Sequence, residues 1–117
     1  MNGLEITHAE VGGATVLRLA GDFDIAGESE ARVALERAQS ARPEILVIDL
    51  AKVDFMDSPG LRVILGADAE ARREGRRLVL VRGPEHVHRV FLVALLDRRL
   101  EIVDDLGEVT APNEDSG

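Results

Sequence analysis

The chain has 117 residues, a length typical of one domain that buries its own hydrophobic core. It contains no cysteine, which excludes disulfide bonds, thiolate metal sites and a cysteine nucleophile. The formal net charge of -8 argues against electrostatic binding to nucleic acid or anionic lipid. The amino terminus does not resemble a signal peptide and no apolar run has membrane-spanning length, so we expect a soluble cytoplasmic protein.

The first part of the chain predicts a β-hairpin followed by a helix. Residues 4–8 alternate apolar and polar side chains, and Gly12-Gly13 supplies a turn into a second strand at 15–19. From about Gly27, apolar side chains recur at helical spacing until Arg42-Pro43 ends the helix.

The rest of the chain alternates strands and helices. The unbroken apolar run at 45–48 predicts a central strand covered on both faces. The later predicted elements are a helix ending at Gly75, a strand at 78–81, a helix after Pro84 with the apolar stripe Val87, Val90, Phe91, Ala94 and Leu95, a strand at 101–103 and a helical turn near 106–109. The order β-β-α-β-α-β-α-β indicates a single α/β domain with a mixed sheet of four to five strands. Its core spans about 4–109, and a polar tail follows at 110–117.

The junction between the central strand and the second helix is the candidate functional site. Ser58 precedes a proline, which favours the extended backbone of a helix cap, and Pro59 fits the first helical position. We therefore expect the Ser58 hydroxyl at a helix N-terminus, beside Asp57 and at the carboxyl end of a buried strand, where sites of open α/β sheets lie. The structural alternative is a serine cap that contributes about 1 kcal/mol, and the two roles are compatible.

Three motifs in a fixed order give the chain a family resemblance. They are Gly21-Asp22-Phe23-Asp24 after the second strand, Val47-Ile48-Asp49-Leu50 in the central strand, and Asp57-Ser58-Pro59-Gly60-Leu61 at the start of the second helix. With these motifs the sequence resembles a STAS domain, the fold of bacterial anti-sigma-factor antagonists, over roughly residues 4–109.

The resemblance implies a regulatory module that switches partners and is not an enzyme. In this family the unphosphorylated antagonist binds a serine kinase that also serves as the anti-sigma factor. The kinase then phosphorylates the serine that matches Ser58, the complex separates, and a PP2C-type phosphatase resets the antagonist. Asp24 matches the family aspartate that helps to engage the kinase.

Pro59 departs from the family pattern, which has a small or hydroxyl residue after the serine, so a kinase would have to accept a Ser-Pro backbone. The resemblance implies no catalytic residue, cofactor or metal, and a homodimer is compatible with it.

The second helix carries a second face besides its predicted core stripe, which is formed by Gly60, Val63, Ile64, Ala67 and Ala71. At 100° per residue, Leu61, Arg62 and Leu65 lie on the same side as Ser58, and an apolar surface rimmed by charges is typical of a docking patch. We interpret the following as partner-binding residues: Asp22, Asp24, Asp57, Gly60, Leu61, Arg62 and Leu65. The alternatives are that the two leucines widen the core stripe and that the aspartates at 22 and 24 only satisfy backbone N–H groups of a turn.

Other functions stay open at this stage. A hydrolase with Ser58 as nucleophile lacks a G-x-S-x-G elbow and a histidine in a motif. A STAS domain can also be an accessory subunit of a lipid transporter, a stress-signalling scaffold, or a sensor of a nucleotide or small ligand. Asp22 and Asp24 alone are too few ligands for a metal ion.

The aromatic and histidine side chains do not indicate a site. His86 and His88 point in different directions from one helix, and we expect both to face solvent. We expect Phe55 and Phe91 in the core, and an aromatic content of 3% offers no platform for stacking nucleic-acid bases.

Overall fold

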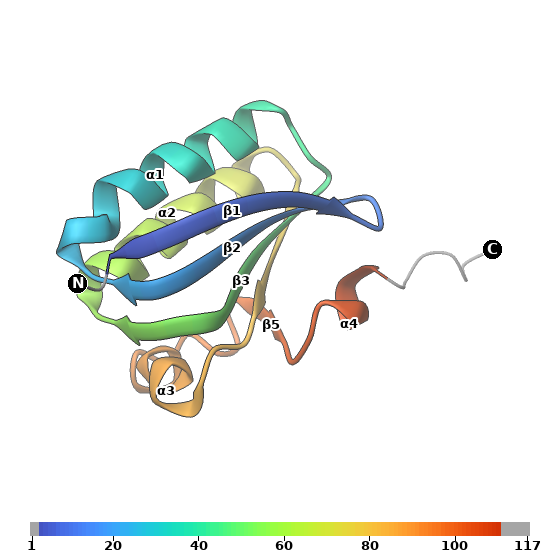
Figure 1. Ribbon diagram of the computed structural model, residues 1–117. Coiled ribbons are helices and arrows are strands. Elements are labelled where there is room, and N and C mark those ends of the chain that lie inside the picture. The colour runs from blue at the N-terminus through green and yellow to red at the C-terminus, as the bar shows by residue number, and fades with distance from the viewer. Residues whose placement is uncertain (1–2, 111–117) are drawn as a thin grey trace.

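The computed structural model describes residues 3–110, which form a five-stranded mixed sheet with helices packed on it (Figure 1). The strands are β1 (Leu4–Val11), β2 (Ala14–Phe23), β3 (Ile45–Met56), β4 (Arg77–Val81) and β5 (Glu101–Val103). They lie in the order β1-β2-β3-β4-β5, with β1 antiparallel to β2 and the others parallel to their neighbours. The predicted α/β fold and element order are confirmed.

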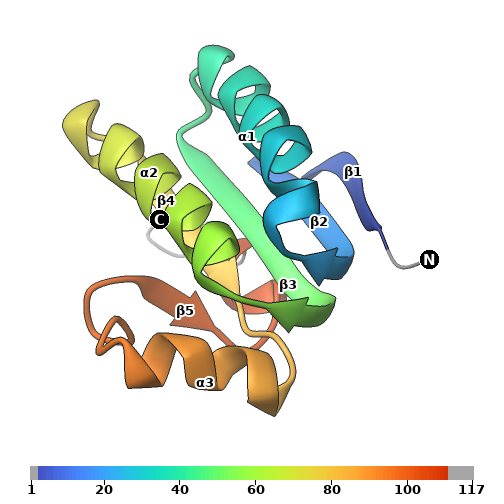
Figure 2. The same ribbon diagram turned by 90° about the vertical axis from the view of Figure 1, so that its left-hand side faces the viewer.

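The helices are α1 (Ile25–Ser40), α2 (Ser58–Arg73), α3 (Glu85–Val93) and α4 (Gly107–Thr110). Figure 2 shows α1 and α2 side by side over one face of the sheet, with α3 on the other side of α2 from α1. The predicted helical turn near 106–109 is α4, which extends to Thr110. The rest of the predicted polar tail lies outside the described residues. Among residues 3–110, no helix has both the length and the apolarity needed to cross a bilayer.

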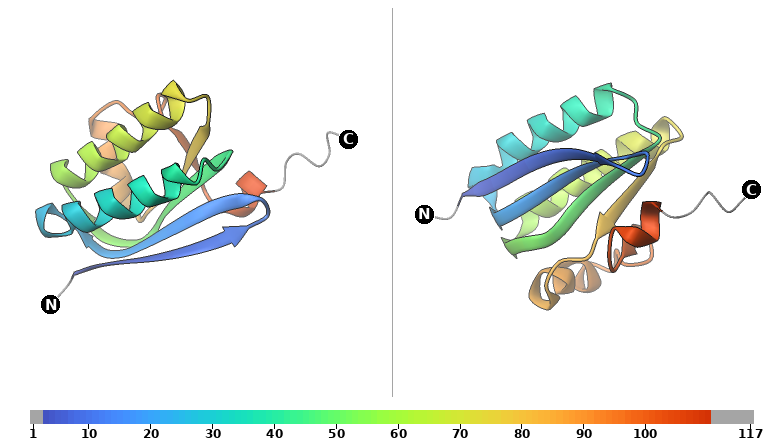
Figure 3. Two further views of the ribbon diagram at one scale, coloured as in Figure 1. Left: turned by 90° about the horizontal axis from the view of Figure 1, so that it is seen from above. Right: turned by 45° about the vertical axis from the view of Figure 1, so that its right-hand side comes forward.

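The sheet is covered on both faces at its centre. Leu46 and Ile48 of β3 belong to the large core beneath α1, α2 and α3, whereas Val47 faces a smaller apolar cluster that includes Val109 of α4. Figure 3 shows α4 on the side of the sheet away from α1 and α2. The prediction that β3 is a central strand covered on both faces is therefore confirmed.

Glycines form the hairpin turn and follow the end of α2. Gly12 and Gly13 connect β1 to β2 with φ values of 57° and 85°, which is the left-handed region that glycine adopts without strain. Gly75 has a φ of 70° just past the C-cap of α2 at Glu74. Both positions agree with the sequence prediction.

The predicted apolar stripe of α3 is wrong in its last turn. Val87 and Phe91 are buried as expected, but the helix ends at Val93, before Ala94 and Leu95. Leu95 has a φ of 61° and its side chain is 81% exposed. The left-handed backbone breaks the helical periodicity, so Leu95 turns away from the core.

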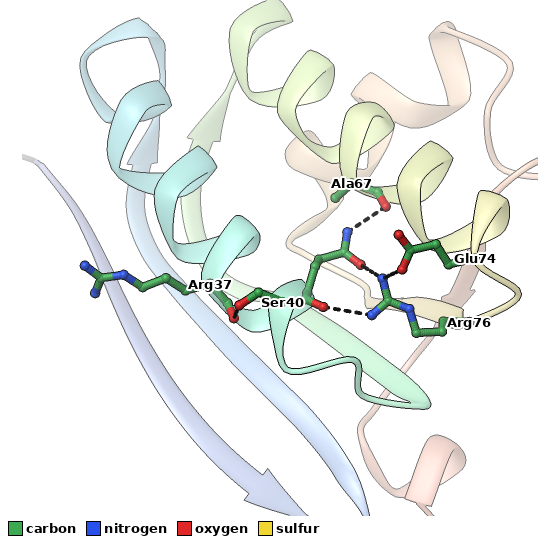
Figure 4. A network of polar contacts seen from close by, with 6 residues as sticks. Arg37, Ser40, Ala67, Glu74 and Arg76 are labelled. Atoms are coloured by element: carbon green, nitrogen blue, oxygen red, sulfur yellow. Dashed lines mark hydrogen bonds and ion pairs between the residues drawn. The ribbon is translucent and has the colours of Figure 1, made fainter.

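A buried polar network fixes the carboxyl end of α1 against α2. Gln39 is buried, and its side-chain amide donates to the Ala67 carbonyl at 3.0 Å. The Arg76 guanidinium donates to the backbone carbonyl of Gln39 at 2.9 Å and to Glu74 at 2.6 Å (Figure 4). These bonds satisfy polar groups that would be costly to bury unpaired, and they set the relative position of the two helices.

Candidate functional site

Ser58 is an exposed residue at the start of α2, where the chain leaves the carboxyl end of β3. The helix begins one residue earlier than predicted. Asp57 holds the N-cap position with extended backbone angles of φ -133° and ψ -165°, so Ser58 is the first helical residue and Pro59 the second. The interpretation of Ser58 as the cap is therefore wrong. The prediction that Ser58 lies exposed at a helix N-terminus is confirmed.

Asp57 occupies the cap position without a side-chain capping bond. Its Oδ1 atom is buried and has no hydrogen-bond partner within the described part of the chain. An aspartate at an N-cap usually accepts a bond from a backbone N–H two or three residues later. Pro59 has no N–H to offer, which removes the donor at the second helical position.

Gly60 allows the first turn of α2 to pack closely against the end of β2. A Cβ atom at this position would lie 2.8 Å from the Phe23 carbonyl oxygen and 2.9 Å from Cγ of Met56, both closer than ordinary van der Waals contact. This close approach gives a physical reason for glycine two residues after the serine. It also couples the position of Ser58 to the end of β2.

Asp22 and Asp24 lie at the same edge of the sheet as Ser58. The register pairs Asp22 with Phe55 and Phe23 with Met56, so the residues that follow β2 and β3 are neighbours. The Asp24 carboxylate accepts a hydrogen bond of 3.0 Å from the backbone N–H of Ala26 and caps α1. Turn chemistry thus explains Asp24 in part, and its half-buried side chain lies at the same edge of the sheet as Ser58.

Leu61 and Leu65 are half-buried and pack against the large core, whereas Arg62 is exposed. The two leucines therefore widen the core stripe, as the alternative predicted, yet each leaves part of its side chain at the surface. Arg62 lines a groove of about 320 Å³ between α1 and α2, which Glu28 also lines.

Two exposed apolar residues at this edge were not predicted from the sequence as part of the site. Ile25, the first residue of α1, is 71% exposed, and Phe55 near the end of β3 is 46% exposed. The expectation that Phe55 lies in the core is wrong. Val53 and Met56 are the buried residues there, three positions apart, and the β2–β3 pairing shifts register between Gly21 and Asp22. Such an irregularity interrupts the alternation of a strand and turns Phe55 outward.

The histidines of α3 differ from each other. His86 is exposed, as expected, and its Nε2 lies 2.6 Å from the Asp54 carbonyl oxygen, a contact that ties α3 to the end of β3. His88 was expected to face solvent, but it is half-buried and its Nδ1 has no contact with solvent. Desolvation lowers the pKa of His88, which favours a neutral ring.

The edge around Ser58 is acidic and partly apolar. Asp22, Asp24 and Asp57 lie at this edge, and Arg62 follows in the second turn of α2. Within residues 3–110, no three histidine or acidic side chains come close enough to hold a metal ion. An exposed hydroxyl among carboxylates and half-exposed apolar side chains is suited to contact with another protein.

Comparison with known proteins gives consistent matches over most of the chain. The family model described as "Mlab, STAS domain" matches residues 6–104. An anti-sigma-B factor antagonist from Listeria monocytogenes is 34% identical over 95 residues, which cover 81% of this chain and 83% of the relative.

Two solved structures share the fold. An anti-sigma factor antagonist from Mycobacterium paratuberculosis superposes with a TM-score of 0.82 at 21% identity, covering 90% of this chain and 89% of that chain. The Bacillus cell fate determinant SpoIIAA in its phosphorylated form superposes with a TM-score of 0.69 at 19% identity, covering 90% and 96% of the two chains.

Proposed function

Because this chain belongs to the STAS domain family of anti-sigma factor antagonists, we propose that it is a cytoplasmic regulator controlled by phosphorylation of Ser58. With Ser58 unmodified, it binds an anti-sigma factor that has serine kinase activity. Phosphorylation of Ser58 releases that partner, and a PP2C-type phosphatase restores the binding form. The observation that supports this proposal most is the exposed Ser58 hydroxyl beside Asp57.

The isolated domain tolerates phosphorylation of Ser58. A phosphoserine adds a charge of about -1.5 to -2 and three strong acceptor oxygens. At position 58 these oxygens lie at the N-terminus of a helix of 16 residues, where the helix dipole favours an anion. The side chain is exposed, so the phosphate keeps its hydration and the fold is left intact.

The complex with the anti-sigma factor, in contrast, does not tolerate a phosphate on Ser58. In a docked interface the phosphate would be desolvated near Asp57, with Asp22 and Asp24 at the same edge of the sheet. A buried charge without a partner costs about 3–5 kcal/mol, which weakens binding by roughly two to four orders of magnitude. The same group therefore changes the partnership and leaves the domain folded.

The apolar side chains around Ser58 indicate which kind of surface the partner must have. Ile25 and Phe55 are exposed, and Leu61 and Leu65 expose part of their surface. We assign Ile25 and Phe55 to the contact surface together with Asp22, Asp24, Asp57, Gly60, Leu61, Arg62 and Leu65. A matching partner has apolar pockets surrounded by basic side chains, since aromatic anchors and complementary charge dominate such interfaces.

Phosphorylation is tested by intact-mass analysis after incubation of the purified chain with its candidate anti-sigma kinases and ATP. We expect one added phosphate that maps to Ser58 and is absent from Ser58→Ala. The proposal would be contradicted if the phosphate mapped to another residue. It would also be contradicted if no kinase that binds the chain added a phosphate.

A further inference from the structure

A cavity of about 280 Å³ lies at the opposite end of the sheet from Ser58, where β4 and β5 begin. It is lined by Asp68, Arg72, Arg76, Arg77, Leu78, Arg98, Arg99, Leu100 and Glu101. Five of the 14 basic residues of an acidic protein thus surround one small hollow. They come from the end of α2, the connection to β4, the start of β4 and the loop after α3, so the fold brings these positive charges together.

Three of these arginines are held by internal bonds. The Arg72 Nε donates to Asp68 at 2.8 Å, and the Arg77 Nε donates to Glu101 at 2.8 Å. Arg76 donates to Glu74 and to the buried Gln39 (Figure 4). These guanidinium groups are therefore fixed in place before any ligand arrives.

The other two arginines are free to bind. Arg98 and Arg99 are exposed, and within residues 3–110 neither guanidinium forms an ion pair. The backbone carbonyl of Arg99 accepts a hydrogen bond from Arg72, which anchors the loop that carries both side chains. Asp68, Glu74 and Glu101 each pair with one of the other three arginines, so two positive charges at this cavity stay uncompensated.

A cluster of arginine side chains in a small cavity favours binding of a compact anion with several charges. Guanidinium groups form paired hydrogen bonds to phosphate oxygens, and a phosphate accepts from several arginines at once. The cavity volume of about 280 Å³ lies just below the range of small-molecule pockets, about 300–1,000 Å³, which suits a phosphate group better than a drug-sized ligand.

We propose that this cavity binds a phosphate group, with Arg98 and Arg99 supplying the uncompensated charge, independently of the function proposed for Ser58. Two sources offer this chemistry: a soluble phosphate compound and the headgroup of an acidic phospholipid. The second source is relevant because Leu92, Val93 and Leu95, at the end of α3 and just before the arginine loop, are exposed.

The test uses inorganic pyrophosphate as the soluble probe in isothermal titration calorimetry. We expect saturable binding that weakens about tenfold or more in Arg98→Gln/Arg99→Gln, because each loses a charge-assisted bond. The loop anchor survives in this variant, since Arg72 bonds to a backbone carbonyl. The matched control Arg18→Gln/Arg32→Gln removes two arginines that pair with Asp49 and Glu28, and it should bind as the wild type does.

Liposome flotation distinguishes the two sources. The site is assigned to a lipid headgroup if the protein floats with vesicles that contain phosphatidic acid, does not float with pure phosphatidylcholine vesicles, and is displaced from the first kind by pyrophosphate. Pyrophosphate binding without flotation assigns it to a soluble phosphate. Absence of pyrophosphate binding, or equal weakening in the cavity variant and the control, overturns the proposal.

Discussion

Replacing Gly60 by alanine tests whether close packing of α2 against β2 places the Ser58 junction. The new Cβ would lie 2.8 Å from the Phe23 carbonyl oxygen and 2.9 Å from Cγ of Met56. Met56 can adjust its flexible side chain, but the carbonyl belongs to the last residue of β2, which is paired with β3. The clash therefore has to be relieved by moving the first turn of α2.

The expected cost follows from two opposing effects. Forcing an extra methyl group into a packed site typically costs about 1–3 kcal/mol. Alanine recovers up to about 1 kcal/mol because glycine is a poor helix former, and less in the first turn. We expect Gly60→Ala to lower the free energy of unfolding by about 1–2 kcal/mol, which corresponds to a fall in Tm of roughly 4–8 °C.

Gly66→Ala in the same helix is the matched control. Gly66 is exposed and its added Cβ would meet no atom within 4 Å, so the same substitution should stabilise the protein by about 0.5–1 kcal/mol. Urea denaturation followed by circular dichroism measures both variants. If Gly60→Ala were as stable as Gly66→Ala, the packing explanation of this glycine would be refuted.

Three further predictions concern the helix interface, the contact surface and one ion pair. Gln39→Ala should cost about 2–4 kcal/mol of unfolding free energy, because it removes the side-chain hydrogen bonds to the Ala67 carbonyl and from Arg76 and opens a cavity. A loss below about 1 kcal/mol in urea denaturation would contradict this. Phe55→Ala should weaken binding to the cognate anti-sigma kinase about tenfold or more in calorimetry with little change in Tm, and unchanged affinity would remove Phe55 from the interface. The hydrogen bond from Arg77 lowers the pKa of Glu101, so this pair stabilises the fold above the unfolded pKa of glutamate and is lost as pH falls through the folded value. Glu101→Gln should therefore be less stable than the wild type at pH 7, and the difference should shrink below about pH 4; a constant difference across this range would refute the assignment.

Local patterns predicted the elements because each pattern has a local cause. Two glycines with left-handed backbones form the β1–β2 turn, and the apolar run at 45–48 became the strand between the two cores. Gly75 follows the end of α2 as predicted. In each case the backbone preference or the hydrophobic period agrees with the tertiary structure.

The errors arose where tertiary structure overrides the local pattern. A register irregularity between β2 and β3 turned Phe55 to the surface, and a left-handed residue at Leu95 ended the stripe of α3. The cap assignment of Ser58 failed by one residue, which is the usual uncertainty of a helix boundary.

Long-range features had no signal in the sequence. The arginine cavity joins residues around 72, 77 and 98, which the β4–β5 pairing and the α3 loop bring together. Ile25 precedes the predicted helix start at about Gly27 and has no sequence signal of its own, whereas in the structure its side chain is 71% exposed among the described residues.

The affinity of the cognate anti-sigma kinase for wild type, Ser58→Ala and Ser58→Asp tests the central claim most directly. We expect Ser58→Ala to bind about as tightly as the wild type and Ser58→Asp to bind roughly 100-fold more weakly, with unchanged Tm for both. Ser40→Asp is the control, because Ser40 is exposed at the last residue of α1, at the opposite edge of the sheet from Ser58, and it should bind as the wild type does. Equal affinities of Ser58→Asp and wild type would contradict the proposal that charge at this hydroxyl releases the partner.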